Sequence, residues 1–255
     1  MSIPFVKTVC TAMENIAPLR LAEKWDNVSV SLSAYMCCSL YLIRFLTRSS
    51  LTPSVVEECI SLEAPVIVSY HPPVFRSLQS LTLSNPLQAS LLRCAADGIS
   101  IFSPHSALDS VWGGVNDWLA KGLGKGRSLD VNGKSEGAEG RLLVDMVKKH
   151  LGLLQVQVAY PSSSGNVRTV AICAGSGGSM LVGRDADLYL TGEMSHHEVL
   201  ASVAAGKHVI LCGHTNTERG FLPVLAERLR KEIQVDDLEV IVSQKDAASV
   251  GLCLR

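Results

Sequence analysis

The stretch DLYLTGEMSHHEVLASVAAGKHVILCGH, residues 187–214, decides the class of fold. Its apolar run at 187–192 predicts a buried strand, and HVILCG at 208–213 predicts a second. Residues 195–205 between them predict a helix, with Ser195 as N-cap and Glu198 completing a capping box. A strand, a helix and a strand in this order predict an α/β protein.

The same alternation continues on both sides of this stretch. The helices expected elsewhere are 3–24, 51–62, 85–98, 113–123, 141–151 and 216–231. The strands expected elsewhere are 65–70, 99–103, 154–159, 167–173 and 238–243. Together they predict α/β layers built on a largely parallel or mixed sheet.

Two segments stand apart from this pattern. Residues 30–47 form the longest apolar stretch, but Arg44 and three serines make it a poor membrane span. We expect a buried strand pair or a core helix there. Residues 124–140 are rich in glycine, serine and charge, which predicts a flexible linker.

The linker sets the expected domain boundaries. They are an N-terminal α/β lobe at 1–124, a linker at 125–140 and a C-terminal α/β lobe at 141–255. Each lobe is long enough to bury a core of its own.

Composition narrows the classes of function. The chain has 255 residues with 23 Lys+Arg and 24 Asp+Glu, so its net charge of −1 argues against direct nucleic-acid binding. Hydrophobic residues make up 47%, enough for a large core. The eight cysteines form no C-x-x-C pair, which favours a reducing compartment. Without a signal-peptide core at the N-terminus, we expect a cytoplasmic protein and no membrane partner.

Three predicted strands end in a histidine. VIVSYH ends at His71, SIFSPH at His105 and VILCGH at His214. Ligands of open α/β sheets collect at the carboxyl ends of the strands. Two of these histidines precede an acid by four residues, because Asp109 follows His105 and Glu218 follows His214.

Imidazoles and carboxylates together suit a divalent metal such as zinc, iron or manganese. A pair of ions bridged by a carboxylate would serve hydrolysis. The simpler alternative is that each histidine bonds a loop carbonyl and that each acid stabilises a first helical turn.

Further candidate residues lie near these. Glu193 and His197 precede or begin the helix at 195–205, and we expect them to orient a metal ligand or to transfer protons as catalytic residues. The Gly-rich run CAGSGGS at 173–179 offers backbone amides for a phosphate or forms a tight turn. Trp25-Asp26-Asn27 is expected to serve packing and capping.

With these residues collected, the chain resembles the eukaryotic branch of the NGG-one-interacting factor three-like family. The words that carry the resemblance are LAEKWDN (21–27), VSYHPPVF (68–75), PHSALDS (104–110), GGVNDWLAKGLG (113–124), ICAGSG (172–177), DLYLTGEMSHHEVL (187–200) and VILCGHTNTERGFLP (209–223). The resemblance implies two similar α/β lobes with helices on the sheet faces and a dinuclear metal site between the lobes. It also implies a homo-oligomer, often a hexamer.

By motif, the resemblance places the family's metal ligands at His71, Asp109, His214 and Glu218, for up to two ions per chain. Bacterial members carry two adjacent histidines at the first position, whereas this chain has Tyr70 before His71. His105 lies close enough in sequence to compensate or to sit in an outer shell. The segment 30–50 matches the family poorly, and only the linker stands where many members have an extra domain.

The candidate metal ligands and the family resemblance suggest two alternative functions, and the sequence does not decide between them. One is a metal-dependent hydrolase, and the label of a type 2 GTP cyclohydrolase, given to some relatives, names a nucleotide as substrate. The other is a transcriptional corepressor-type protein that acts through contacts with a transcriptional regulator or a signalosome subunit, with the nucleus as a second location. A third hypothesis is a metal store or metal chaperone, which would bind metal without converting any substrate.

Overall fold

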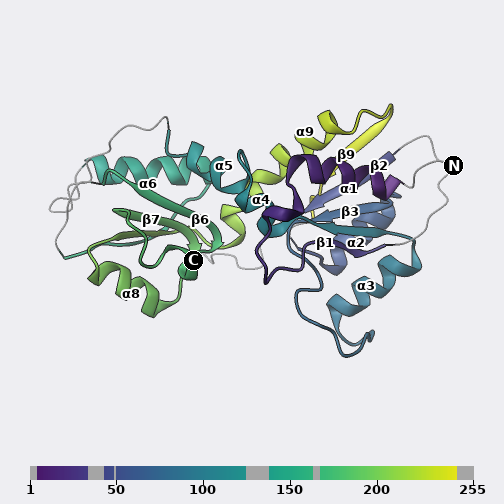
Figure 1. The fold of residues 1–255 in the computed structure, drawn as a ribbon, viewed down its shortest axis with the longest axis horizontal. Helices are drawn as coiled ribbons and strands as arrows, with labels where there is room; N and C mark the ends of the chain where they lie inside the picture. Colours follow the sequence, from purple (N-terminus) through teal and green to yellow (C-terminus); the bar gives the residue numbers. More distant parts are fainter. Residues whose placement is uncertain (1–4, 34–42, 49, 125–137, 163–166, 246–255) are drawn as a thin grey trace. The chain divides into compact units, whose positions relative to one another are not determined.

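The structure is a computed structural model that describes residues 5–33, 43–48, 50–124, 138–162 and 167–245 (Figure 1). The chain forms two compact units. The first contains the described residues up to Val111 together with those from Phe221 onward, and the second is Trp112–Gly220. Both units are mixed α/β layers, as the sequence predicts.

The first unit is built on a five-stranded sheet in the order β1-β4-β3-β2-β9. Its strands are β1 (Ser29–Leu32), β2 (Ile43–Arg48), β3 (Val66–Ser69), β4 (Ser100–Ser103) and β9 (Leu238–Val242). Strands β4, β3, β2 and β9 are mutually parallel, and β1 is antiparallel to β4. The parallel arrangement places the ends of β3 and β4 at one edge.

Helices cover both faces of this sheet. Figure 1 shows α1 and α9 together over one face and α2 and α3 over the other. Their bounds are α1 (Phe5–Ile16), α2 (Pro53–Ser61), α3 (Pro86–Ala96) and α9 (Leu222–Glu232), and the short α4 (His105–Ser110) follows β4. The α2–α3 layer buries Val55, Cys59 and Cys94 against Ile67 and Ile101 of the sheet. Burial of such side chains supplies most of the stabilising free energy of the layer.

The second unit has a four-stranded sheet in the order β5-β8-β7-β6. Its elements are α5 (Val115–Lys121), α6 (Ala138–Leu151), β5 (Gln157–Ala159), β6 (Val170–Ser176), α7 (Gly178–Leu181), β7 (Leu188–Glu193), α8 (His196–Ala204) and β8 (His208–Leu211). Strands β6, β7 and β8 are parallel, while β5 is antiparallel to β8. The predicted capping box of Ser195 and Glu198 is present at the start of α8, so the prediction of this helix is confirmed.

Two helix predictions need correction. The predicted helix 3–24 ends at Ile16, because Pro18 has no backbone N–H and disfavours helical geometry in the residue before it. The predicted helix 216–231 begins only at Leu222, where Pro223 lies in its first turn. Residues 215–221 instead form two short 3-10 turns.

The apolar stretch 30–47 contributes two strands, β1 and β2, that do not pair with each other. Each pairs with a strand from later in the chain, because β4 and β3 lie between them. Part of the stretch, 34–42, lies outside the described residues. In the described part of the chain, no helix is long and apolar enough to cross a membrane.

The structure divides the chain elsewhere than at the predicted linker. The described residues from Phe221 to Lys245 belong to the first unit, because β9 pairs with β2 and α9 packs on α1 and β9. The predicted C-terminal lobe at 141–255 therefore corresponds only in part to the second unit. Most of the predicted linker at 125–140 lies outside the described residues, and its last three residues begin α6.

Candidate metal centre

His214 and Glu218 form a close pair in the second unit. His214 follows β8, and a 3-10 turn at Thr215–Thr217 brings the acid four residues later onto the same side. The His214 Nε2 and Glu218 Oε1 atoms are 3.0 Å apart, and only 3% of the Glu218 side chain is exposed. The predicted spacing of histidine and acid therefore produces the contact that two ligands of one ion require.

Glu193 occupies the other nitrogen of the same imidazole. It is the last residue of β7, and its Oε1 lies 2.8 Å from His214 Nδ1. Glu218, by accepting a hydrogen bond, raises the pKa of His214 to about 9 against the effect of burial, and Glu193 adds to the rise. Two carboxylates on one imidazole make this a place where positive charge is stabilised.

Gly175 leaves the space that the donor atoms need. Its φ is +67°, and a Cβ there would stand 2.6 Å from Glu218 Oε1 and 3.0 Å from His214 Nε2. The backbone of Gly175 is fixed on both sides, because its N–H donates to Thr217 Oγ1 and its carbonyl accepts from Thr191 Oγ1. A side chain at this position would therefore push against the donors rather than move away.

The Gly-rich run at 173–179 is explained mainly by close packing. A Cβ on Gly177 would come within 2.4 Å of Thr191 Oγ1, and one on Gly178 within 2.2 Å of Glu198 Oε2. The run covers the end of β6 and the start of the four-residue α7. The alternative of a tight turn accounts for these glycines without a bound phosphate.

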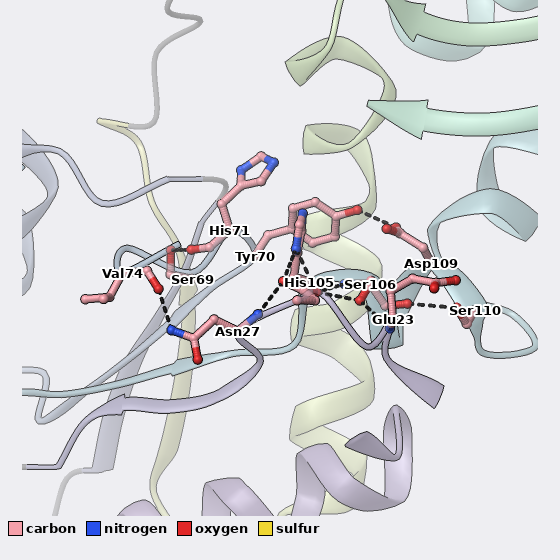
Figure 2. Close-up of polar contacts among 11 residues, drawn as sticks. Glu23, Asn27, Ser69, Tyr70, His71, Val74, His105, Ser106, Asp109 and Ser110 are labelled. Atoms are coloured by element: carbon pink, nitrogen blue, oxygen red, sulfur yellow. Dashed lines mark hydrogen bonds and ion pairs between the residues drawn. The ribbon is translucent and has the colours of Figure 1, made fainter. Parts of the chain in front are cut away.

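In the first unit, the ends of β3 and β4 bring two of the predicted histidines together (Figure 2). The ring centroids of His71 and His105 are 5.2 Å apart. His71 also contacts Ser50, with 3.1 Å between Nδ1 and the serine Oγ. Strand-end placement therefore gathers these side chains, as the sequence predicts.

Tyr70 and Asp109 face each other in the same unit, as Figure 2 shows. The Tyr70 hydroxyl donates a hydrogen bond to Asp109 Oδ1, and the tyrosine is buried. Asp109 lies on α4, one turn after His105. The Tyr70 phenol thus holds a carboxylate oxygen of a predicted metal ligand.

Asp26 contacts His105 and Ser106, two partners that the sequence pattern did not predict for it. Its fully buried carboxylate lies 2.8 Å from His105 Nδ1 and accepts from the backbone N–H and the hydroxyl of Ser106. Burial opposes ionisation of Asp26, but the hydrogen bonds from His105 and Ser106 outweigh it and lower the pKa. The sequence motif WDN marks the position of Asp26 but gives no indication that its partner, His105, lies 79 residues away.

His105 itself has a φ of +26°, which is rare for a residue with a side chain. Its backbone N–H donates to the Tyr70 carbonyl at 3.1 Å, and Asp26 holds its ring. The surrounding bonds therefore offset the strain at this residue.

The predicted catalytic residues differ in their surroundings. Glu193 contacts His214, as described, whereas His197 is exposed on α8, where the centroid of its ring lies 5.8 Å from that of His196. The roles of Glu193 and His197 in proton transfer stay predictions. So do the roles of His71 and Asp109 as metal ligands and the meeting of both units at one metal centre.

The family model described as Duf34/NIF3 (NGG1p interacting factor 3) matches residues 4–248 of the chain. The chain belongs to the Duf34/NIF3 family. Protein NIF3 homolog of Schizosaccharomyces pombe is 42% identical over 92% of this chain and 93% of its own length. NGG1-interacting factor 3 of Saccharomyces cerevisiae is 36% identical, with 90% of each chain covered.

Solved structures confirm the Duf34/NIF3 fold. A Bacillus cereus protein related to NIF3 aligns with a TM-score of 0.80 at 16% identity, over 97% of this chain and 98% of its own. Reduced HcgD from Methanocaldococcus jannaschii aligns with a TM-score of 0.75 at 22% identity, over 93% and 96%. At these identities the likeness concerns the fold.

The donor set of this family member fits a metal ion. His214 and Glu218 could take part in holding one, with imidazole nitrogen and carboxylate oxygen as donors. Their 3.0 Å separation is close to that of neighbouring ligands on one ion with bonds of about 2.0–2.2 Å. The space beside Gly175 keeps both donor atoms clear of a side chain.

Proposed function

We propose that this chain binds a divalent metal ion and uses it in hydrolysis. The proposed ligands are His214 and Glu218, joined by His71 and Asp109, which the family motif assigns. The contact of 3.0 Å between His214 Nε2 and Glu218 Oε1 is the observation that carries the proposal. Zinc, iron or manganese suits these donors, with up to two ions per chain.

The electrostatics of the second unit support this proposal. Glu218 and Glu193 raise the pKa of His214 to about 9, so the two carboxylates around this imidazole stabilise a cation. A divalent ion at Nε2 would take the place of the proton shared with Glu218. Binding therefore releases a proton and requires the neutral imidazole.

Each residue of this unit has a defined part in the proposed chemistry. Glu193 accepts the Nδ1 hydrogen of His214 and so directs Nε2 toward the ion, as carboxylates do behind histidine ligands. Glu218 contributes a buried negative charge. The ion, when bound, supplies Lewis acidity to a water or to the substrate. His197 is the proposed proton carrier.

Elemental analysis of purified protein tests metal binding. We expect bound metal in the wild type and a lower metal content in His214→Ala after the same dialysis, because a ligand is lost. The control is His196→Ala, which removes an exposed histidine on α8. Wild-type protein without metal after dialysis against zinc, iron and manganese in turn would refute the proposal.

Hydrolysis needs a separate test. Metal-loaded wild type and His214→Ala are incubated with a panel of phosphate esters and nucleotides, and release of product is followed. Turnover by the wild type that His214→Ala lacks supports the hydrolase. Equal turnover by both proteins, or none by the wild type, would remove it.

A second proposed function is regulation through protein contacts. The name of the Saccharomyces cerevisiae relative states an interaction with NGG1. We propose that this chain likewise binds a transcriptional regulator. The family resemblance adds a signalosome subunit as an alternative partner, assembly as a homo-oligomer and the nucleus as a second location. A pull-down with NGG1 that persists in His214→Ala would support this function, whereas no binding by the wild type would contradict it.

A further inference from the structure

Two aromatic rings stand exposed at the edge of the first unit. Trp25 lies before β1 and Phe75 lies after β3, and 60% and 48% of their surfaces are exposed. Their ring centroids are 5.9 Å apart at an interplanar angle of 59°. We name this pair the aromatic shelf.

The aromatic shelf rests on His105. The centroid of this imidazole is 6.0 Å from Trp25 and 6.1 Å from Phe75, with both rings nearly perpendicular to it. Since His105 approaches each ring at a steep angle, it does not cover either ring by parallel stacking. His71 lies against the same imidazole, with 5.2 Å between the ring centroids of His71 and His105.

The backbone holds the aromatic shelf in place. Asp26, next to Trp25, is buried and bonded to His105 and Ser106. The Asn27 side-chain amide donates to the Val74 carbonyl, so it ties the loop of Trp25 to the loop of Phe75. Exposed rings on such a fixed frame lose little conformational entropy when a ligand covers them.

Charge favours an anionic ligand with a planar ring. Lys24 directly precedes Trp25 and Arg76 directly follows Phe75, and both cations are exposed. The described part of the chain contains no ion pair of either cation. Two exposed rings, each next to a lysine or an arginine in the sequence, match a flat ring that carries a phosphate, since stacking holds the ring and the cations attract the anion.

We propose that the aromatic shelf of Trp25 and Phe75 binds the base of a nucleotide beside His71. This inference deepens the proposed function, because it names the substrate class for the sheet edge that carries one of the assigned ligands. Base stacking on an aromatic side chain contributes about 1–3 kcal/mol, or roughly five- to 150-fold in affinity. Trp25 and Phe75 would therefore set the preference for a planar ring, whereas the metal ligands would act on a part of the nucleotide other than the base.

Calorimetric titration with inosine 5′-monophosphate tests this binding. We expect saturable binding by the wild type and at least a fivefold weaker affinity in Trp25→Leu and in Phe75→Leu. The control is Trp112→Leu, since Trp112 is 92% exposed and lies in the other unit. It should bind within twofold of the wild type. Ribose 5-phosphate, which lacks the base, should bind at least fivefold more weakly than the nucleotide.

The outcomes separate this inference from metal binding. Trp25→Leu and Phe75→Leu should keep the metal content of the wild type, measured by elemental analysis. Absence of nucleotide binding by the wild type, or unchanged affinity in both shelf variants, would overturn the inference even if metal is bound. Equal affinity for ribose 5-phosphate would also overturn it. If Trp25→Leu fails to fold by circular dichroism, Phe75→Leu decides.

Discussion

Substitution of Gly175 by alanine tests the geometry of the second unit most directly. A Cβ at this position would stand 2.6 Å from Glu218 Oε1, which is 0.8 Å inside the 3.4 Å at which ordinary contact begins. Glu218 is buried, so its carboxylate has little room to retreat. A shift of this size exceeds the tolerance of about 0.2 Å within which metal–ligand distances are held.

Two effects on stability add in Gly175→Ala. Alanine at a φ of +67° costs about 1–2 kcal/mol relative to ordinary backbone. Loss of the hydrogen bond between His214 and Glu218 removes about 1.5–3 kcal/mol more, since both groups are charged. We therefore expect the free energy of unfolding of the metal-free protein to fall by about 2.5–5 kcal/mol.

Gly152→Ala is the matched control. Gly152 has a φ of +66°, and a Cβ there would meet nothing within 4 Å. It therefore carries the same backbone strain without the contact, and we expect a loss of about 1–2 kcal/mol and unchanged metal affinity. Urea unfolding of the two variants gives the difference.

Two further readouts complete the test. Competition with a chelator measures zinc affinity, which should fall at least tenfold in Gly175→Ala only. NMR titration should show the pKa of His214 at about 9 in the wild type and lower in Gly175→Ala, because its contact with Glu218 is lost. An unchanged pKa of His214 together with unchanged zinc affinity would refute the reasoning.

Three other changes have expected outcomes. Glu193→Gln removes the charge behind His214 and should weaken zinc binding by about tenfold without unfolding the protein, which chelator competition would measure; unchanged affinity would contradict the outer role of Glu193. Tyr70→Phe removes the hydrogen bond to Asp109 and should lower the free energy of unfolding by about 1–2 kcal/mol in urea titrations, and a stability equal to that of the wild type would show that the bond contributes nothing. Burial lowers the pKa of His150 below 6.5, so the unfolded chain binds this proton more readily than the folded chain. The free energy of unfolding is therefore unaffected by His150 above about pH 6.5 and falls as the pH drops below it. Between pH 7.5 and pH 5.5, urea titrations should show a larger decrease in the free energy of unfolding for the wild type than for His150→Gln.

Several features of the candidate site were predictable because they depend on near neighbours in the chain. Apolar runs predicted the strands that end before His71, His105 and His214, and the four-residue spacing predicted the contact of His214 with Glu218. The capping box of α8 was equally local. Such features follow from backbone geometry over one turn or one strand.

Other features joined residues that the sequence leaves far apart. Asp26 reaches His105 across 79 positions, and Tyr70 reaches Asp109 across 39. The need for glycine at position 175 becomes clear only from its proximity to Glu218, which lies 43 positions later in the sequence. No periodic pattern in the sequence predicts that the two residues of any of these pairs are in contact.

The sequence by itself determined the α/β class, the order of most helices and strands and the histidines at strand ends. Only the tertiary structure decided that β9 joins β2, so that α9 and β9 belong to the first unit. The physical reason is that apolar patterning specifies which residues become buried, whereas the choice of neighbouring strand depends on how distant segments pack and exchange hydrogen bonds.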